Sequence, residues 1–387
     1  MKIALIAPTY LPARRANTIQ VMKMAQAFVA LGHEIVVLVP GRGDPVPSWD
    51  ELSHHYGLRQ RFEIEWLPVH PRFRSYDYGI SAVRRAYAWG ADLIYTRLPQ
   101  AAALASFWGI ATIYEIHDAP LGSLAPLLFS RFLKGSGARG LVVITAALSE
   151  ALIPKFSPPK SLPVVIAPDG VDLARYKDLP APAEARQQIA AQLPHYPATQ
   201  FTVGYTGHLY PGRGADLIIE IAAQLPDVHF LLVGGEPNDV ERTRTAAHSR
   251  ELENLTLTGF IPNADLPRYQ AACDMLLMPY QRQVSASSGG DIARYLSPMK
   301  LFEYLACGRA ILSSDLPVLQ EVLNQQNAVL LPADDPVAWV AAIRELQANP
   351  ERRAALAAQA QIGAQQYTWE ARASKILELI DITDRGR

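Results

Sequence analysis

Short apolar runs alternate with helical patterns along the first part of the chain. Residues 2–8 form a continuous apolar run, and residues 16–32 follow with apolar side chains at steps of three and four and a closing glycine. Further apolar runs span 34–40, 91–97, 111–117, 140–145 and 162–168. Continuous apolar strands joined by helices predict an α/β domain with a parallel sheet covered on both faces.

The alternation stops between residues 172 and 200, where proline and alanine are frequent and no strand-like run occurs. It restarts with apolar runs at 201–207, 229–235, 255–259, 274–280, 310–315 and 328–332. The pattern predicts two doubly wound, Rossmann-like domains, residues 1–172 and 201–367, joined by a linker at 173–200. Ligands of such sheets bind at the carboxyl ends of the strands, so we expect the domains to face each other across a cleft.

Composition narrows the class of protein. The 387 residues are 49% hydrophobic and carry a formal net charge of −1, which argues against a nucleic-acid binder driven by bulk positive charge. Two cysteines, Cys273 and Cys307, are too few for a disulfide framework. No run approaches the ~20 apolar residues that span a bilayer, and the first run is too short for a signal peptide. A cytoplasmic protein is predicted.

The loops after the strands limit the ligand. No Gly-x-Gly-x-x-Gly follows the first strand and no Gly-Lys-Ser/Thr follows any strand, which disfavours nicotinamide or flavin enzymes and P-loop ATPases. The loop after residues 201–207 is rich in glycine, contains Arg213 and enters a helix. Such a loop can bind phosphate through its backbone, the helix N-terminus and the arginine. A turn with a solvent-facing arginine is the alternative.

The segment SPMKLFEYLACG at 297–308 raises a second phosphate hypothesis. Ser297 fits the N-cap of a helix, and Pro298 fits its first position. Lys300 then lies in the first turn, where its charge opposes the helix dipole, and Glu303 follows on the same face. This placement suggests an anion ligand, with a surface ion pair as the alternative. The glycine-rich loop in the same domain favours the functional interpretation.

These motifs belong to a longer resemblance. The chain is similar over nearly its whole length to the retaining glycosyltransferases of family 4, which have the two-domain GT-B fold. The matching segments include GHEIVVLVP, IYEIHD, LVVITAAL, APDGVD, YTGHLYPGRGADLIIEIAAQ, HFLLVGGEPND, LTGFIPNADLPRYQAACDMLLMPY and SPMKLFEYLACGRAILSSDLPVLQEVL. The resemblance implies that the second domain binds a UDP- or GDP-sugar and the first a hydroxyl acceptor. It also implies that a C-terminal helix within 368–387 crosses back onto the first domain.

The resemblance assigns roles to residues of the second domain. Arg213 and Lys300 are expected to bind the diphosphate and to act in catalysis, and Glu303 to accept hydrogen bonds from the ribose hydroxyls. Phe260 and Ile261 match the segment that reads the edge of the base.

Other expected site residues lie at the starts of loops. His117 resembles the first-domain catalytic histidine that faces the donor sugar, with a core or capping histidine as the alternative. Asp118 and Asn17 match regions that approach the substrates, and Gly207 begins the glycine-rich loop.

Two positions depart from the family pattern. His208 stands where the family usually has an arginine, and Tyr295 stands where it has a first glutamate that holds donor-sugar hydroxyls. Asp291 is the nearest acid and a candidate substitute. The identity of the donor sugar therefore stays open.

The resemblance implies a reaction with retained anomeric configuration and no cofactor. No Asp-x-Asp motif is present to hold a metal ion, so a metal-independent reaction is expected. A sugar-nucleotide epimerase or a binding protein without turnover is the alternative. An epimerase needs acid/base groups, of which only His117 and Asp118 occur together, and a binding protein would be expected to lose the phosphate ligands.

The acceptor is the least defined partner. Residues 72–90 combine Arg72, Arg74, Arg84 and Arg85 with five aromatic residues. This segment could contact an anionic membrane or a lipid-linked acceptor, with an ordinary solvated helix as the alternative. The sequence leaves the acceptor and the oligomeric state open.

Overall fold

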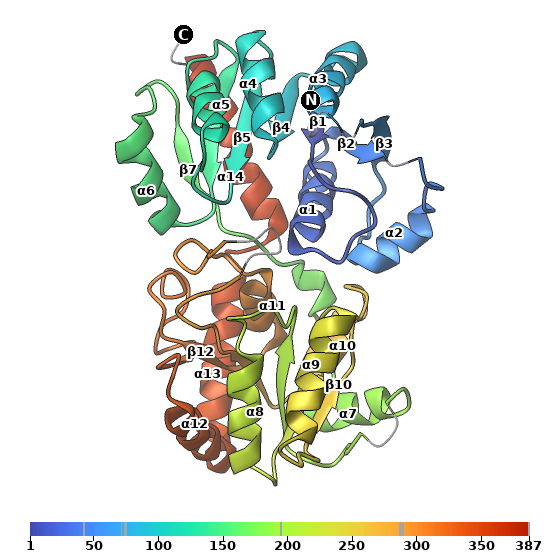
Figure 1. Ribbon diagram of the computed structural model, residues 1–387, viewed down its shortest axis with the longest axis vertical. Coiled ribbons are helices and arrows are strands. Elements are labelled where there is room, and N and C mark those ends of the chain that lie inside the picture. Colours follow the sequence, from blue (N-terminus) through green and yellow to red (C-terminus); the bar gives the residue numbers. More distant parts are fainter. Residues whose placement is uncertain (42, 71, 73–75, 194–195, 286–289, 386–387) are drawn as a thin grey trace. The chain divides into compact units, whose positions relative to one another are not determined.

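The computed structural model describes residues 1–41, 43–70, 72, 76–193, 196–285 and 290–385 (Figure 1). The chain divides into two compact units, one of Met1–Asp169 with Trp369–Arg387 and one of Gly170–Thr368. Each unit contains one parallel sheet with helices on its faces. The predicted fold class, two doubly wound α/β domains, is confirmed.

In the described part of the first unit, seven parallel strands have the order β3-β2-β1-β4-β5-β6-β7. The strands are β1 (Lys2–Ile6), β2 (Glu34–Gly41), β3 (Glu63–Pro68), β4 (Leu93–Thr96), β5 (Thr112–Ile116), β6 (Ala138–Val143) and β7 (Val164–Ile166). The helices are α1 (Ala16–Ala30), α2 (Trp49–Tyr56), α3 (Tyr76–Trp89), α4 (Pro99–Phe107), α5 (Leu124–Leu133), α6 (Ala146–Phe156) and α14 (Trp369–Arg385). The central strands are buried on both faces, which explains their continuous apolar sequences.

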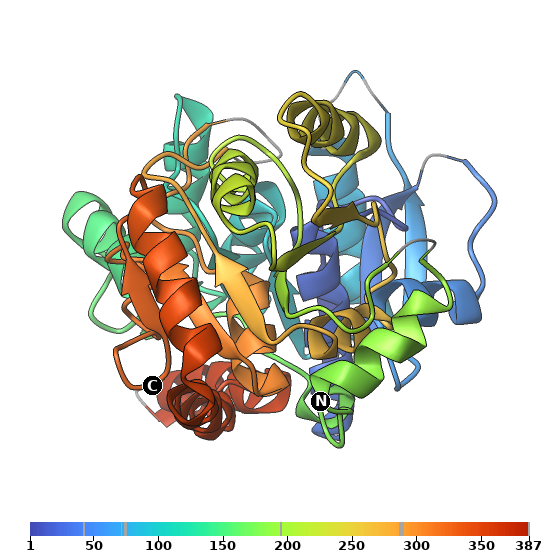
Figure 2. The ribbon, with the colours of Figure 1, turned by 90° about the horizontal axis from the view of Figure 1, so that it is seen from below.

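The second unit repeats this design, with the order β10-β9-β8-β11-β12-β13 among its described strands. The strands are β8 (Thr202–Thr206), β9 (His229–Val233), β10 (Leu255–Leu257), β11 (Met275–Met278), β12 (Ala310–Ser314) and β13 (Val329–Leu331). The helices are α7 (Pro182–Ala190), α8 (Ala215–Gln224), α9 (Pro237–His248), α10 (Leu266–Ala271), α11 (Met299–Cys307), α12 (Pro336–Ala348) and α13 (Pro350–Ala364). Figure 2 shows the sheet between α8 and α9 on one side and α10 and α11 on the other.

The strand β3 was not predicted from the apolar runs of the sequence. This strand pairs with β2 at the edge of the first sheet, in the register Val36↔Glu63 to Gly41↔Pro68. Its sequence, EIEWLP, has no fully buried residue, in contrast to the central strands. Continuous apolar runs are typical of central parallel strands and are absent from such an edge strand.

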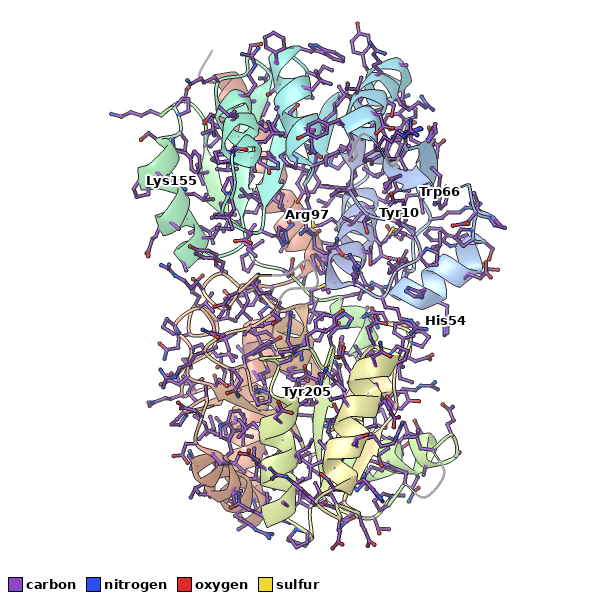
Figure 3. All side chains as sticks on the ribbon, viewed as in Figure 1. Tyr10, His54, Trp66, Arg97, Lys155 and Tyr205 are labelled. Carbon is purple, nitrogen blue, oxygen red and sulfur yellow. The ribbon has the colours of Figure 1, made fainter. Side chains whose placement is uncertain are left out.

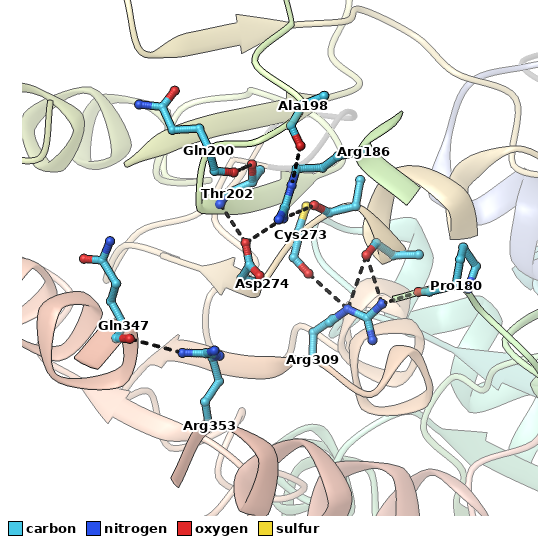
Figure 4. Close-up of polar contacts among 12 residues, drawn as sticks. Pro180, Arg186, Ala198, Gln200, Thr202, Cys273, Asp274, Arg309, Gln347 and Arg353 are labelled. Carbon is cyan, nitrogen blue, oxygen red and sulfur yellow. Dashed lines mark hydrogen bonds and ion pairs between the residues drawn. The ribbon is translucent and has the colours of Figure 1, made fainter. Parts of the chain in front are cut away.

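The described residues of the predicted linker, 173–193 and 196–200, belong to the second unit. They include a 3₁₀ turn at Leu173–Arg175 and helix α7, which packs against α10 within the second unit. Arg186 of α7 forms an ion pair with Asp274 at 2.7 Å and donates to the carbonyl of Ala272 (Figure 4). Proline at the first helical position and alanines within it form a helix, not a flexible connection.

A second arginine, Arg309, also connects the segment around α7 to the rest of the second unit. Arg309 follows the end of α11 and donates from its guanidinium to the carbonyl oxygens of Ala271, Cys273 and Pro180 (Figure 4). It therefore fastens the segment before α7 to the elements that flank β11 and β12.

Helix α14 belongs to the first unit, although it follows the whole second unit in sequence. It packs against α1 and β6, and Figure 1 shows it, in red, beside α1. The C-terminal helix was expected to return to the first domain.

Candidate functional site

The strand order of each sheet reverses at one point, between β1 and β4 in the first unit and between β8 and β11 in the second. Loops that leave such neighbouring strands diverge and leave room for a ligand. Arg97, which follows β4, and Tyr205, the penultimate residue of β8, mark these two places in Figure 3. Most of the residues expected at the site lie in or beside these loops.

Glycine is required in the loop between β8 and α8. Gly207 has φ of 127°, and a Cβ there would lie 2.9 Å from Nζ of Lys300. Gly214 has φ of 92°, and a Cβ there would lie 2.1 Å from the carbonyl oxygen of Pro279. The loop therefore packs directly on the segments that follow β11, and any side chain at these positions would force it away.

Lys300 is buried beneath this loop. The side chain lies in the first turn of α11, with Nζ 3.6 Å from the ring centroid of Tyr205 and 5.3 Å from that of Tyr280. Its ammonium group makes no hydrogen bond to any described residue. Burial, followed by the positive charge of Arg213, holds the pKa of Lys300 well below its usual value. A buried ammonium group without a partner is costly unless an anion binds it.

Arg213 also faces Tyr280. Its guanidinium lies 5.5 Å from the ring centroid of Tyr280, and Nη1 is 3.3 Å from the hydroxyl oxygen of that residue. Its Nε is buried and has no hydrogen-bond partner among the described residues. Two cations with unused donors beside one glycine loop form a site suited to a multiply charged anion such as a diphosphate.

The start of α11 differs slightly from the prediction. The helix begins at Met299, with Pro298 as the N-cap in place of Ser297, and no side chain caps it. Lys300 and Glu303 nevertheless lie in the first turns of the helix, and both are buried. The surface ion-pair alternative is therefore wrong.

Glu303 is held by a buried hydrogen-bond network. Its Oε2 accepts from Nε2 of Gln270 at 3.3 Å, and the same nitrogen donates to Oγ1 of Thr206 at 3.2 Å. The hydroxyl of Tyr176 donates to Oε1 of Gln270 at 2.9 Å. No described residue donates to Oε1 of Glu303, so this oxygen can accept from a ligand.

The ends of β8, β9 and β10 meet at their glycines. The amide of Gly207 donates to the carbonyl of Val233 at 2.8 Å, and that of Gly234 donates to the carbonyl of Gly259 at 2.8 Å. Phe260 and Ile261 follow directly and are half-buried. This arrangement places the predicted base-reading segment at the carboxyl ends of the strands, where the loop with Arg213 and the start of α11 with Lys300 also lie.

Asp291 is occupied by its own loop. The side chain is exposed, and its Oδ1 accepts from the backbone amides of Val284 at 2.8 Å and Ala293 at 2.9 Å. These two bonds lower its pKa. The hydrogen bonds give Asp291 a local structural role, and its binding of donor-sugar hydroxyls stays a prediction.

The ring of His208 stacks on that of Tyr210 with a centroid distance of 4.6 Å.

His117 of the first unit lies in a buried polar cluster. It follows β5 and hydrogen-bonds through Nε2 to Oε1 of Glu115. Nε2 of Gln20 donates to the same carboxylate oxygen at 2.7 Å, and Nη1 of Arg97 donates to Oε1 of Gln20 at 3.0 Å. Burial, then the charge of Arg97, lowers the pKa of His117 to about 4.

Two further predicted residues lie beside this cluster in the sequence. Asn17 is in the first turn of α1, and its Oδ1 is buried without a hydrogen-bond partner in the described chain. Asp118 is exposed and accepts from the backbone amide of Ala119 at 2.8 Å. Partial desolvation of its carboxyl group nevertheless raises the pKa of Asp118. The substrate-binding roles of both residues stay predictions.

Residues 72–90, the segment predicted to contact a membrane, have only some of their described side chains free to do so. Arg74 lies outside the described residues. Tyr78 is buried and donates to the carbonyls of Ala7 and Leu38, and Arg85 pairs with Glu65.

A different surface, which we call the α5 face, exposes Leu121, Leu124 and Leu127 beside Arg131 and Phe107. The Arg131 guanidinium lies 3.9 Å from the Phe107 ring centroid.

The described residues also bear on membrane spanning and metal binding. None of their helices is long and apolar enough to cross a membrane. No group of three or more His, Cys, Asp or Glu side chains among them could hold a metal ion.

Comparison with known families points to one class of enzyme. The model described as Glycosyltransferase Family 4 matches residues 18–175, and that described as Glycosyl transferases group 1 matches residues 200–349.

Curated relatives carry related names. The chain is 26% identical to a D-inositol 3-phosphate glycosyltransferase of Xylanimonas cellulosilytica, over 55% of this chain and 50% of that protein. It is 22% identical to a phosphatidyl-myo-inositol mannosyltransferase of Mycolicibacterium smegmatis, over 98% of this chain and 94% of that protein. The chain thus spans about half the length of the first of these relatives.

Solved structures share the fold. Anabaena HepE, crystallised in complex with UDP, superposes with a TM-score of 0.75 at 20% identity. The match covers 98% of this chain and 100% of that chain.

Proposed function

Since the chain belongs to the family-4-like glycosyltransferases with the GT-B fold, we propose that it moves a hexosyl group from a UDP- or GDP-sugar to a hydroxyl acceptor with retained configuration. The observation that carries this proposal is the pair of cations beside the glycine loop of the second unit. Lys300 and Arg213 both leave hydrogen-bond donors without partners in the described chain. A diphosphate supplies the negative charge that both require.

The two cations have a direct chemical use. When the bond between the anomeric carbon and the diphosphate breaks, the electron pair stays on the phosphate oxygen and its negative charge grows. Fixed positive groups that contact this oxygen stabilise the transition state more than the ground state. Lys300, Arg213 and the amino end of α8 can act in this way.

Other residues position the donor in this scheme. Glu303 accepts hydrogen bonds from the ribose through its open Oε1, and the loop at Phe260 and Ile261 contacts the base. The acceptor hydroxyl attacks from the side of the leaving group and transfers its proton to the departing phosphate, which preserves the anomeric configuration. The reaction as proposed needs no cofactor and no metal ion, because Lys300 and Arg213 supply the positive charge at the diphosphate.

We also propose contact between the α5 face and an anionic membrane surface, which suits a lipid-linked acceptor. Leu121, Leu124 and Leu127 are 71%, 46% and 65% exposed. Arg131 and Lys134 lie at the end of the same helix, and no acidic residue occurs between Asp118 and Glu150. Apolar side chains beside unopposed cations are typical of surfaces that bind anionic lipids.

The decisive experiment begins with thermal stabilisation of the protein by a panel of UDP- and GDP-sugars. The donor that stabilises it is then incubated with and without sugar, glycoside and lipid-linked acceptors, and products are identified by mass spectrometry and by NMR of the anomeric proton. We expect an acceptor-dependent glycoside of retained configuration, formed equally well with excess chelator. Conversion of the donor to an epimer would indicate an epimerase, and stabilisation without turnover would indicate a binding protein. Loss of activity on chelation, restored by magnesium or manganese, would contradict metal independence.

A further inference from the structure

Helix α14 brings a charged side chain into the interior of the first unit. Arg372 is 5% exposed. Its Nε donates to the carbonyl of Pro168 at 2.9 Å, and its Nη1 donates to the hydroxyl of Tyr95 at 3.2 Å. These bonds fix the guanidinium, so its remaining nitrogen, Nη2, has a defined direction.

Nη2 of Arg372 points to Glu115. The two form an ion pair, with Nη2 3.0 Å from Oε1 of a carboxylate that is 1% exposed. Burial alone would raise the pKa of Glu115, but the charge of Arg372 and the contact with His117 outweigh it and hold the pKa below its ordinary value. Glu115 is therefore an ionised acceptor that has no proton to donate.

Gln20 adds direction to the same oxygen. Its amide oxygen accepts from Arg97, so its amide nitrogen must face Glu115, to which it donates at 2.7 Å. Oε1 of Glu115 thus accepts a hydrogen bond from Gln20, forms an ion pair with Arg372 and lies in hydrogen-bond contact with the ring of His117. No rearrangement of the carboxylate is needed to hold the imidazole.

The protonation state of His117 follows from this surrounding. A carboxylate that only accepts requires a proton on the ring nitrogen that faces it, which is Nε2. Burial, the charge of Arg97 and the charge of Arg372 disfavour a second proton on the ring, although Glu115 opposes them. At neutral pH, Nδ1 then carries a lone pair.

We infer that Arg372 and Glu115 are positioning residues that hold His117 as the neutral Nε2–H tautomer, so that Nδ1 accepts a hydrogen bond from a substrate hydroxyl. A hydroxyl that donates to Nδ1 keeps its oxygen lone pairs free for other donors, whereas an imidazolium would compete for them. The role toward a sugar hydroxyl rests on the proposed function, but the tautomer does not.

The sequence does not show this chain of contacts. Glu115 and His117 are two residues apart, but Arg372 is more than 250 positions away and reaches Glu115 only because α14 packs on α1 and β6. A helix that follows the second unit thereby sets the chemistry of a residue in the first.

The test uses the full-length protein labelled with ¹⁵N-histidine. Long-range ¹H–¹⁵N correlation spectra distinguish the two neutral tautomers and the imidazolium, and the His117 signals are assigned by their loss in His117→Gln. At pH 7 we expect His117 as the Nε2–H tautomer. In Arg372→Met and Glu115→Gln this signal should change to a mixture of tautomers, while Arg372→Lys should retain it largely. Lys375→Met is the matched control, because Lys375 is on the same helix and donates outward to the carbonyl of Ile166.

Kinetics supply a second readout. Arg372→Met is expected to lower kcat by about ten- to a hundredfold with little change in KM, by analogy with the range found when the hydrogen-bond partner of a metal-ligating histidine is removed. Partial recovery in Arg372→Lys would separate positioning from general destabilisation. An Nδ1–H tautomer or an imidazolium in the wild type, or an unchanged spectrum in folded Arg372→Met, would overturn the inference. The spectra need no turnover, so a failure of the proposed glycosyl transfer would leave this result standing.

Discussion

Lys300 combines a cost to folding with a use in binding. A buried ammonium group without hydrogen-bond partners destabilises the folded state, and the ring of Tyr205, 3.6 Å away, offsets only part of this. Proteins commonly keep such groups where a ligand needs them. We therefore expect Lys300→Met to melt at a higher temperature than the wild type without nucleotide, and to gain much less stability when UDP or GDP is added. Arg250→Ala, at an exposed arginine of the same unit, is the control. Equal stabilisation of Lys300→Met and wild type by nucleotide would show that Lys300 does not bind it.

Arg213 and Lys300 should act as a unit. Both face Tyr280, so both are expected to contact the same diphosphate. Removing either charge should reduce kcat more than it weakens donor binding, because the phosphate charge grows in the transition state. In a double-mutant cycle of Arg213→Ala and Lys300→Ala we expect a coupling free energy of about 1 kcal/mol. Strictly additive effects would place the two side chains on different groups.

Glu303 tests the ribose contact. Its Oε2 is used by Gln270, while Oε1 is open. Glu303→Gln keeps the shape but loses a charge-assisted hydrogen bond of about 1.5–3 kcal/mol, roughly ten- to a hundredfold in affinity for the nucleotide sugar. The melting temperature should hardly change. A variant that binds normally and melts much earlier would make Glu303 a structural residue.

At the residue scale, the sequence points to candidate site residues mainly where a local rule is broken. Lys300 opposes the helix dipole, which predicts an anionic ligand, and the structure places its ammonium group buried without a partner among the described residues, while the binding of a diphosphate stays a prediction. Glu115 was missed, although an acid within the buried run TIYEI is the same kind of signal. Arg372 gives no such signal, because its partners come from distant parts of the chain.

At the scale of elements, periodicity predicted the central strands, but it did not predict the edge strand β3 or the helix α7. The strand β3 is half-exposed, so its sequence alternates. Residues 182–190 look like a linker by composition but form α7, which the ion pair between Arg186 and Asp274 holds against the rest of the second unit. Such pairs are not visible in local sequence.

The α5 face gives an element-scale prediction. Leu124→Glu with Leu127→Glu should weaken binding to vesicles that contain phosphatidylglycerol by about tenfold or more, since two apolar side chains no longer insert. Co-sedimentation measures this, and added salt should weaken binding of the wild type. The control, Val337→Glu with Ile362→Glu, changes two residues of the second unit that are at least as exposed as Leu124. A wild type that ignores these vesicles would contradict the proposal. Self-association lost in the α5 variant would assign the face to a second copy of the chain.

At the scale of the whole molecule, the two units are expected to differ in their response to acid. In the second unit, burial lowers the pKa of His229 to about 4, and its ring contacts Thr256 and Tyr196. In the first unit, the pKa of His117 is also about 4, but burial raises that of Asp169 to about 7. A lowered histidine pKa removes stability as the pH falls, whereas a raised carboxyl pKa removes stability as the pH rises.

The second unit should therefore lose stability more steeply on acidification. Between pH 6.5 and about 4, the unfolded chain binds a proton at residue 229 that the folded chain does not, which costs up to about 3 kcal/mol. In the first unit, His117 and Asp169 act in opposite directions over most of this range. Hydrogen exchange measured by mass spectrometry at pH 7 and pH 4.5, corrected for the intrinsic exchange rate, should show the larger loss of protection in β8 and β9. His229→Gln keeps a hydrogen-bonding group beside Thr256 without a proton to bind, so it should remove most of this loss, whereas His248→Gln, at an exposed histidine, should not. Equal loss in both units, or a His229→Gln variant as acid-sensitive as the wild type, would show that the buried histidine does not control the acid stability of the second unit.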